Sequence, residues 1–333
     1  MNDNHEQEPL LQVKNLKTHF NTDEGTVKSV DGVSFDMESG QTLAIVGESG
    51  CGKSMTALSI TGLVPPGGEI KGDIIFDGKN ITNLSEKEMR HIRGNDISMV
   101  FQDPSTSLNP LIKIGKQMTE SIRLHQQLGK EEAKEKALEL LRNVGIAHVE
   151  KVLNSYPHTL SGGMKQRVMI AMALSCHPQL IIADEPTTAL DVTIQAQILS
   201  LLDEIKEKTN TAVILISHDL GVVAEMADEV IVLYSGEVVE KSDVFTIFEH
   251  PKHPYTQGLL NSTPRLDEDK EELPSIEGAV PSPLEQVPGC KFYSRCQHAM
   301  DICKEKKPEL TNVNDETGCQ VRCWLYQQQE KFS

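Results

Sequence analysis

The fold of this chain is decided by one stretch, Gly47-Glu48-Ser49-Gly50-Cys51-Gly52-Lys53-Ser54. It has the pattern G-x-x-x-x-G-K-S of a phosphate-binding loop, and it follows an apolar run at Thr42–Val46 that predicts a buried strand. The glycines let backbone N–H groups converge on phosphate oxygens, Lys53 adds a positive charge, and Ser54 offers a hydroxyl to Mg²⁺. Cys51 is interpreted as a packing residue. A glycine-rich turn that only starts a helix is the alternative, and the strand, Lys53 and Ser54 together disfavour it.

A second motif narrows the chemistry. The apolar run Leu180–Ala183 predicts a buried strand that ends in two carboxylates, Asp184 and Glu185. Asp184 is suited to hold a metal ion through water, and Glu185 is placed to polarise the water that attacks a γ-phosphate. Two acids at an ordinary strand exit would be the default interpretation without the phosphate-binding loop upstream. With that loop, the pair favours nucleotide hydrolysis.

A third motif, Leu160-Ser161-Gly162-Gly163-Met164, leads directly into a predicted helix. Its serine and paired glycines make a second anion site at a helix N-terminus. One chain cannot easily fold both anion sites onto the same phosphate group. The sequence therefore predicts a head-to-tail pair of subunits, each closing its Ser-Gly-Gly helix over the nucleotide of the other.

The pattern of elements predicts an α/β fold. From about residue 10 to 240, short β-branched runs alternate with helical stretches, as in a mainly parallel sheet flanked by helices. The runs Leu10–Val13, Val33–Met37 and Asp73–Phe76 predict a smaller antiparallel edge sheet. An inserted helical subdomain is expected at about 108–172, with a helix over Lys130–Val144. Beyond residue 260, prolines and acidic residues predict a linker into a small cysteine-bearing extension.

Composition limits the partners. The chain has 333 residues, with 32 Lys and Arg against 49 Asp and Glu, so its formal net charge is -17. Such a chain repels phosphate backbones, which argues against a nucleic-acid partner. No apolar run approaches the roughly 20 residues of a membrane helix, so any membrane role is expected to be peripheral. The polar, acidic segment Met1–Pro9 lacks the order of a signal peptide, and the chain is expected to stay in the cytoplasm.

Taken together, these motifs resemble the ATP-binding-cassette (ABC) ATPases, a branch of the P-loop NTPases, over roughly residues 10–258. The resemblance implies ATP and Mg²⁺ as cofactors. It also assigns roles by position: Gln102 contacts Mg²⁺ or water and senses the γ-phosphate, Asp191 in Ala189-Leu190-Asp191 communicates across the dimer, His218 contacts the γ-phosphate, and Phe20 stacks on adenine. Met164 departs from the glutamine usual in the family. Because Ser161 and backbone N–H groups make the phosphate contacts, the change is expected to be tolerated.

Several stretches resemble one subgroup, the ATP-binding subunits of bacterial oligopeptide/dipeptide importers. They are Val27–Phe35, Phe101–Pro104 with Ser107–Pro110, and His253–Thr256. The resemblance implies a translocase ATPase at the cytoplasmic face of the cell membrane, paired with a second, different ATPase subunit. Two permease subunits and an extracellular peptide-binding protein would complete the assembly. An importer of nickel or another small solute, and a non-transport ABC ATPase, are the alternatives.

The last part of the chain, residues 259–333, concentrates five cysteines: Cys290, Cys296, Cys303, Cys319 and Cys323. In a reducing compartment such a group favours metal over disulfides. Structural zinc sites favour tighter spacings than those seen here. The segment resembles the C-terminal extension of the same importer subunits, which implies a [4Fe–4S] cluster. Matching by position selects Cys290, Cys296, Cys303 and Cys323 as ligands, with Cys319 as a possible alternative.

Overall fold

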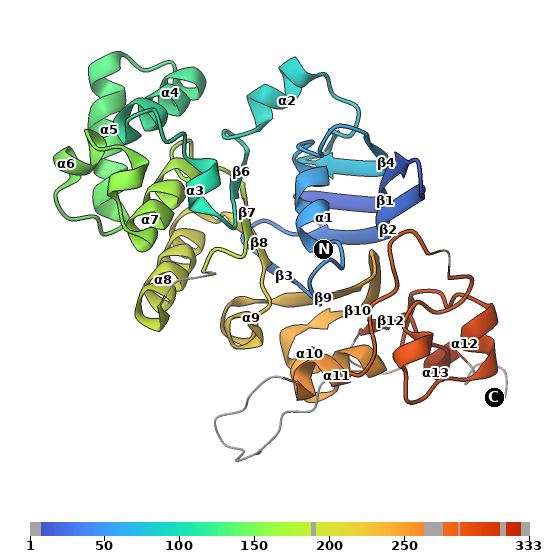
Figure 1. Ribbon diagram of the computed structural model, residues 1–333. Coiled ribbons are helices and arrows are strands. Elements are labelled where there is room, and N and C mark those ends of the chain that lie inside the picture. Colours follow the sequence, from blue (N-terminus) through green and yellow to red (C-terminus); the bar gives the residue numbers. More distant parts are fainter. Residues whose placement is uncertain (1–7, 188–190, 263–275, 286, 314–317, 328–333) are drawn as a thin grey trace, which may run out of the picture. The chain divides into compact units, whose positions relative to one another are not determined.

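A computed structural model of the chain describes residues 8–187, 191–262, 276–285, 287–313 and 318–327 (Figure 1). The chain divides into two compact units, and each draws on separate stretches of the sequence. Unit 1 contains Met1–Met37, Leu43–Thr82 and Ser217–Ser333, whereas unit 2 contains Glu38–Thr42 and Asn83–Ile216.

The strands of the described residues are β1 Leu11–Thr22, β2 Gly25–Met37, β3 Thr42–Val46, β4 Gly68–Phe76, β5 Lys79–Asn80, β6 Ile97–Val100, β7 Leu180–Asp184, β8 Ala212–Ile216, β9 Glu229–Tyr234, β10 Glu237–Asp243, β11 Thr311–Asn312 and β12 Gln320–Val321. The α-helices are α1 Lys53–Ile60, α2 Glu86–Ile92, α3 Pro104–Ser107, α4 Ile114–Gln126, α5 Lys130–Asn143, α6 Val149–Leu153, α7 Gly162–Ala173, α8 Val192–Thr209, α9 Leu220–Met226, α10 Val244–Glu249, α11 Pro254–Asn261, α12 Asp301–Glu305 and α13 Trp324–Gln327. Short 3₁₀ helices cover Pro157–Thr159 and Tyr293–Arg295. Within the described ranges, no helix combines the length and the apolar character needed to cross a membrane.

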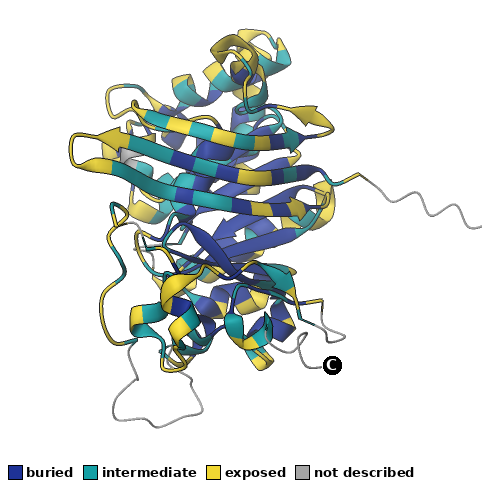
Figure 2. Cartoon of the chain, turned by 90° about the vertical axis from the view of Figure 1, so that its right-hand side faces the viewer, coloured by how far each residue is buried: buried dark blue, intermediate teal, exposed yellow. Residues whose placement is uncertain are grey.

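Unit 1 contains the antiparallel sheet that the sequence predicts, with the strand order β2-β1-β4-β5. Strands β1 and β2 are longer than the apolar runs alone indicate. Their alternation is broken at Asn15, which has a left-handed φ of 50° and lies at a shift in the β1 register. Helix α1 packs against β1 and β2. In Figure 2 the broad strands of this sheet show bands of intermediate and exposed residues, as expected for a sheet with one solvated face.

A second group of strands in unit 1 has the order β11-β12-β10-β9-β3. Strand β3 pairs in parallel with β9, whereas β9, β10, β12 and β11 pair in antiparallel fashion. The sequence predicts a cysteine-bearing appendage behind a linker, yet its strand β12 extends the sheet of the cassette. A segment this short cannot bury a core of its own, and Phe292 packs instead into the same hydrophobic cluster as Tyr234 and Tyr255. The boundary near residue 259 stays a prediction.

Unit 2 contains the parallel strands β6, β7 and β8, in that order, with β7 in the middle. Every residue of β7 and β8 is buried, as their apolar sequences predict. Helices α4, α5, α6 and α7 contact one another and form the helical group that the sequence predicts in this region (Figure 1). Helix α5 buries Ala133, Ala137, Leu140 and Leu141, the residues whose spacing predicts it. The α/β fold class is confirmed.

Candidate functional site

The predicted phosphate-binding loop of unit 1 is a tight turn between β3 and α1. Gly47 and Gly52 have φ values of 148° and 107°, in the region that L side chains rarely adopt. A Cβ atom on Gly47 would lie 2.3 Å from the Leu233 carbonyl oxygen, and one on Gly52 would lie 2.4 Å from that of Ser29. The backbone conformation and the close neighbours therefore require glycine at both positions.

Lys53 is the first residue of α1 and is 6% exposed. Its Nζ donates to the carbonyl oxygens of Gly47, at 2.7 Å, and Glu48, at 3.1 Å. The ammonium group thus lies over the start of the loop, where a phosphate would be bound, and Ser54 follows it in the first turn of the helix. Cys51 is buried, in keeping with a packing role, and burial raises the pKa of its thiol.

Two further predicted residues belong to the same unit as this loop. Phe20 lies on β1 opposite Val27, and its ring approaches Gly68, where an added Cβ would lie 2.8 Å from the ring. His218 is exposed and lies just before Asp219, which caps α9. The structure places His218 at the surface, where an imidazole can reach a bound ligand.

The predicted acidic residues of unit 2 follow β7. Asp184 is 5% exposed, and Glu185 has a left-handed φ of 46°, with its N–H donating to the Ile216 carbonyl at 2.9 Å. A non-glycine residue in this conformation stores strain, which is commonly found at functional sites. Gln102, just after β6, donates from Nε2 to Oε2 of Glu185 at 2.7 Å. The structure thus brings together two predicted catalytic side chains that lie 83 residues apart in sequence.

The Ser-Gly-Gly motif starts α7. The Ser161 hydroxyl caps the helix by accepting from the Met164 N–H at 3.3 Å, and Gly162 has no neighbour within 4 Å of the position of an added Cβ. Ser161 and Gly162 are exposed, so the first N–H groups of this helix are open to a ligand from outside the chain. Asp191 caps α8 through the Ile194 N–H, at 2.9 Å. The neighbouring Ala189 and Leu190 lie outside the described residues.

Four cysteines of the C-terminal segment line one small, mostly apolar pocket in unit 1: Cys290, Cys296, Cys303 and Cys323. These are the four that the sequence selects by position. Cys319 does not line the pocket. It is buried, and its Sγ donates to the Glu240 carboxylate at 3.8 Å.

Burial, the larger cause, and the neighbouring cysteines together raise the pKa of the Cys290 thiol to about 11 and that of Cys323 to about 12. No three His, Cys, Asp or Glu side chains among the described residues are placed to hold one metal ion. A [4Fe–4S] cluster makes a different demand, because each of its four irons takes one thiolate. The four cysteines line one pocket, and a cluster at this place stays a prediction.

Sequence reasoning missed two residues that contact the phosphate-binding loop. The guanidinium of Arg295 pairs with the Glu48 carboxylate at 2.7 and 3.0 Å, and the Tyr255 hydroxyl accepts from the Glu48 N–H at 2.8 Å. Arg295 lies 247 residues from Glu48 in the sequence, and no local sequence pattern predicts a contact between residues so far apart. The only indication in the sequence was Glu48 itself, because an acidic residue in a loop that binds anions suggests a basic partner.

Comparison with known proteins covers nearly the whole chain. A family model described as "ABC transporter" matches residues 30–188, and one described as "Oligopeptide/dipeptide transporter, C-terminal region" matches residues 239–303. The oligopeptide transport ATP-binding protein AppD of Bacillus subtilis is 52% identical, over 96% of this chain and 98% of its own. The dipeptide transport ATP-binding protein DppD of the same organism is 51% identical, over 98% of this chain and 97% of its own. OppD of Haemophilus influenzae is 49% identical, over 98% and 99%.

Solved structures also resemble the chain. The ATP-binding cassette MJ0796, in a dimeric post-hydrolysis state bound to ADP and phosphate, aligns with a TM-score of 0.64 and 29% identity. The alignment covers 70% of this chain and 98% of that structure.

Proposed function

Because the chain belongs to the ATP-binding subunits of oligopeptide/dipeptide ABC transporters, we propose that it hydrolyses ATP to drive the import of oligopeptides or dipeptides across a bacterial cell membrane. The observation that carries the proposal is identity of about half the residues, over nearly full length, to transport ATP-binding proteins for these two substrate classes. The phosphate-binding loop and the Gln102–Glu185 pair supply the chemistry that such a subunit requires.

The nucleotide is held by charge and by backbone donors. The backbone N–H groups of the loop other than those of Glu48 and Cys51, which donate to Tyr255 and to the Glu48 carbonyl, bind the phosphates together with the Lys53 ammonium, and the Phe20 ring stacks on the adenine. Oxygen atoms from Ser54, Asp184 and Gln102 suit Mg²⁺, which prefers hydroxyl, carboxylate and carbonyl oxygens together with water. When bound, Mg²⁺ neutralises charge that develops on the phosphates.

Glu185 is the general base. Its carboxylate takes a proton from the attacking water, and Gln102 holds the carboxylate oxygen by the 2.7 Å hydrogen bond and so fixes its orientation. His218 contacts the γ-phosphate from its own loop. The roles of Glu185 and His218 are those expected from position in the ABC ATPases, whereas the expected role of Gln102 is to contact Mg²⁺ or water and to sense the γ-phosphate.

The substitution Glu185→Gln tests this assignment. It keeps the size of the side chain and removes the base, so ATP binding should persist while turnover falls by about 10²–10⁴-fold. Lys53→Ala is the matched control, because it should weaken binding itself. Equal turnover in wild type and Glu185→Gln would refute the role of Glu185.

The subunit acts in an assembly. The chain would pair with a second, different ATPase subunit. Ser161, Gly162 and Gly163 of this chain would contact the nucleotide bound to that subunit, and Asp191 would lie near the contact. This arrangement is supported by the exposed start of α7. Two permeases and an extracellular peptide-binding protein complete the importer, and the chain is a peripheral protein of the cytoplasmic membrane face. ATP binding closes the pair of subunits, hydrolysis releases them, and this two-state motion drives the permeases.

We propose that Cys290, Cys296, Cys303 and Cys323 would hold a [4Fe–4S] cluster in the cysteine pocket, with a mainly structural role. Ligation adds folding free energy to a segment that has little core of its own. The test is the iron and labile sulfide content of anaerobically purified protein. Cys296→Ser should lose iron, whereas Cys319→Ser should keep it. A folded wild-type protein without iron would contradict the assignment.

A further inference from the structure

The cysteine-bearing segment reaches the phosphate-binding loop through one side chain, Arg295. This residue directly precedes Cys296, which lines the cysteine pocket. Its guanidinium forms a two-pronged ion pair with Glu48, the second residue of the loop: Nη1 donates to Oε2 at 2.7 Å and Nη2 to Oε1 at 3.0 Å. Such paired contacts fix direction as well as distance.

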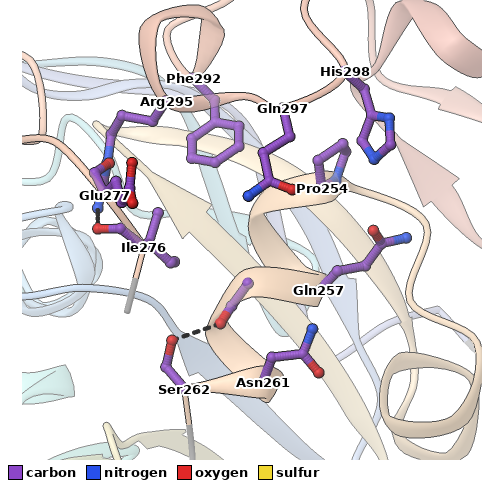
Figure 3. Close-up of a pocket in the computed structure, with 11 residues that line it drawn as sticks. Pro254, Gln257, Asn261, Ser262, Ile276, Glu277, Phe292, Arg295, Gln297 and His298 are labelled. Atoms are coloured by element: carbon purple, nitrogen blue, oxygen red, sulfur yellow. Dashed lines mark hydrogen bonds between the residues drawn. The ribbon is translucent and has the colours of Figure 1, made fainter. Parts of the chain in front are cut away.

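The remaining donors of Arg295 are also used. Nη1 donates to the Tyr234 hydroxyl at 3.3 Å, Nη2 to the Ile276 carbonyl at 3.0 Å, and Nε to the Glu277 carbonyl at 3.0 Å. Figure 3 shows Arg295 beside Ile276 and Glu277. The five N–H donors of the guanidinium therefore all have acceptors. With its side chain only 4% exposed, Arg295 is held rigidly and can fix Glu48 in turn.

The backbone of Glu48 has a second support. Its N–H donates to the hydroxyl of Tyr255, at 2.8 Å, and the Tyr255 ring is fully buried against Tyr234 and Phe292, with ring centroids 4.6 and 5.4 Å away. Phe292 comes from the cysteine-bearing segment. Glu48 is thus held at its side chain and at its backbone by one cluster of residues.

The ion pair has an electrostatic consequence for nucleotide binding. The Glu48 side chain is 27% exposed, and a carboxylate in a loop that receives phosphates would repel them if it were unpaired. Arg295 neutralises this charge and keeps the carboxylate turned toward the cysteine-bearing segment.

Lys291 provides a control that separates attachment of the cysteine-bearing segment from an effect on ATP binding. Lys291 also joins the cysteine-bearing segment to the rest of unit 1: its Nζ lies 2.8 Å from Oε1 of Glu237 and donates to the Ser235 carbonyl at 2.8 Å. The Lys291 side chain is 13% exposed, so it is a matched buried cation. Among the described residues its hydrogen-bond and ion-pair partners are Ser235, Glu237 and Asp31, and none of these belongs to the phosphate-binding loop.

We propose that Arg295 is a positioning residue for ATP: by neutralising and orienting Glu48, it holds the phosphate-binding loop ready for the nucleotide and links the cysteine pocket to ATP affinity. The proposal rests on the proposed function, because it assumes that the loop binds ATP.

The test is titration of the full-length protein with a fluorescent ATP analogue in the presence of Mg²⁺. Arg295→Met removes the hydrogen bonds to a charged group and leaves the carboxylate unpaired, so the dissociation constant should rise by about tenfold. Glu48→Gln in the Arg295→Met background should recover part of the loss, since the unpaired charge is then gone. Lys291→Met should bind as wild type does. In steady-state turnover, Arg295→Met should raise KM and leave kcat near the wild-type value.

The outcomes distinguish a failure of the positioning role from a failure of the proposed function. Wild-type affinity in Arg295→Met, or an equal loss in Lys291→Met, would overturn the positioning role. Failure of the wild-type protein to bind the analogue, or equal binding by Lys53→Ala, would refute the proposed function instead. If Arg295→Met does not fold, Arg295→Gln removes the charge but keeps a polar amide donor, and a dissociation constant unchanged from wild type in that variant would also overturn the role.

Discussion

Glu240 is the most deeply buried carboxylate near the cysteine-bearing segment, and replacing it tests how that segment is attached. It has no exposed surface, and its two oxygens accept from the backbone N–H groups of Lys252, at 2.6 Å, and His253, at 2.8 Å. These donors lie at the N-terminus of α11. The Cys319 thiol also donates to Oε1, at 3.8 Å. The carboxylate thus joins β10, the start of α11 and the last strand of the extension.

The expected cost of Glu240→Gln follows from this geometry. Glutamine keeps one acceptor oxygen, and its amide group then faces the other backbone N–H, which is left buried without an acceptor. An unsatisfied buried donor costs about 1–3 kcal/mol, and we expect a loss of about 2 kcal/mol. At about 2–4 °C per kcal/mol for a chain of this size or somewhat smaller, the thermal midpoint should fall by roughly 4–8 °C.

Thermal unfolding of the full-length protein, followed by circular dichroism, measures the effect. Glu240→Leu should be destabilised more than Glu240→Gln, because both backbone N–H groups then lack an acceptor. The exposed Glu225 of α9 provides the control, and Glu225→Gln should unfold with the wild type. A Glu240→Leu variant as stable as wild type would refute the reasoning, since the buried carboxylate would then have no role as an acceptor.

Three further predictions concern Glu240, Ser161 and Tyr255. Burial raises the pKa of Glu240 above the unfolded value of 4.5. The contribution of this side chain to the free energy of unfolding is therefore complete below pH 4.5 and is lost as the pH rises through the folded pKa. Unfolding at a series of pH values should show that the stability of wild type relative to Glu240→Gln increases toward acid pH. Ser161→Ala removes the cap on the Met164 N–H, which should cost about 1 kcal/mol in urea unfolding and lower ATP turnover in the assembly, while ATP binding by the isolated chain stays at the wild-type level; weakened binding by the isolated chain would contradict this. Tyr255→Phe keeps the ring but leaves the Glu48 N–H without its acceptor, so the free energy of unfolding should fall by about 1–3 kcal/mol. A variant of wild-type stability would exclude this hydrogen bond as a support of the loop.

Much of the fold follows from local sequence, because the parallel strands are continuous apolar runs with no polar face. The runs Thr42–Val46 and Ala212–Ile216 are strands with the predicted bounds, and the run from Leu180 gains one residue, Asp184. The long strand β1 was harder to predict, since Asn15 and a register shift interrupt its alternation. A break of this kind is set by the pairing with neighbouring strands, which periodicity along one segment does not contain.

In the candidate site, too, some residues could be predicted from local sequence and others depend on long-range contacts. The loop from Gly47 to Ser54 could be predicted from its own residues, because the chemistry requires glycines, Lys53 and Ser54 at fixed spacing. A role for Gln102 could be predicted only through resemblance, and its hydrogen bond to Glu185 came from the structure alone. The contact of Arg295 with Glu48 could not be predicted at all, since it depends on how a segment near the C-terminus folds back onto a loop near the N-terminus.

The most direct test of the account is ATP turnover by the chain together with its partner ATPase and two permeases, reconstituted in lipid vesicles with the peptide-binding protein. Turnover should rise when di- or oligopeptides are added, and peptide should accumulate on the side of the membrane opposite the binding protein. Glu185→Gln should abolish both the turnover and the accumulation of peptide. Stimulation by nickel or by DNA with no response to peptide, or peptide accumulation that persists in the Glu185→Gln assembly, would contradict the proposed function.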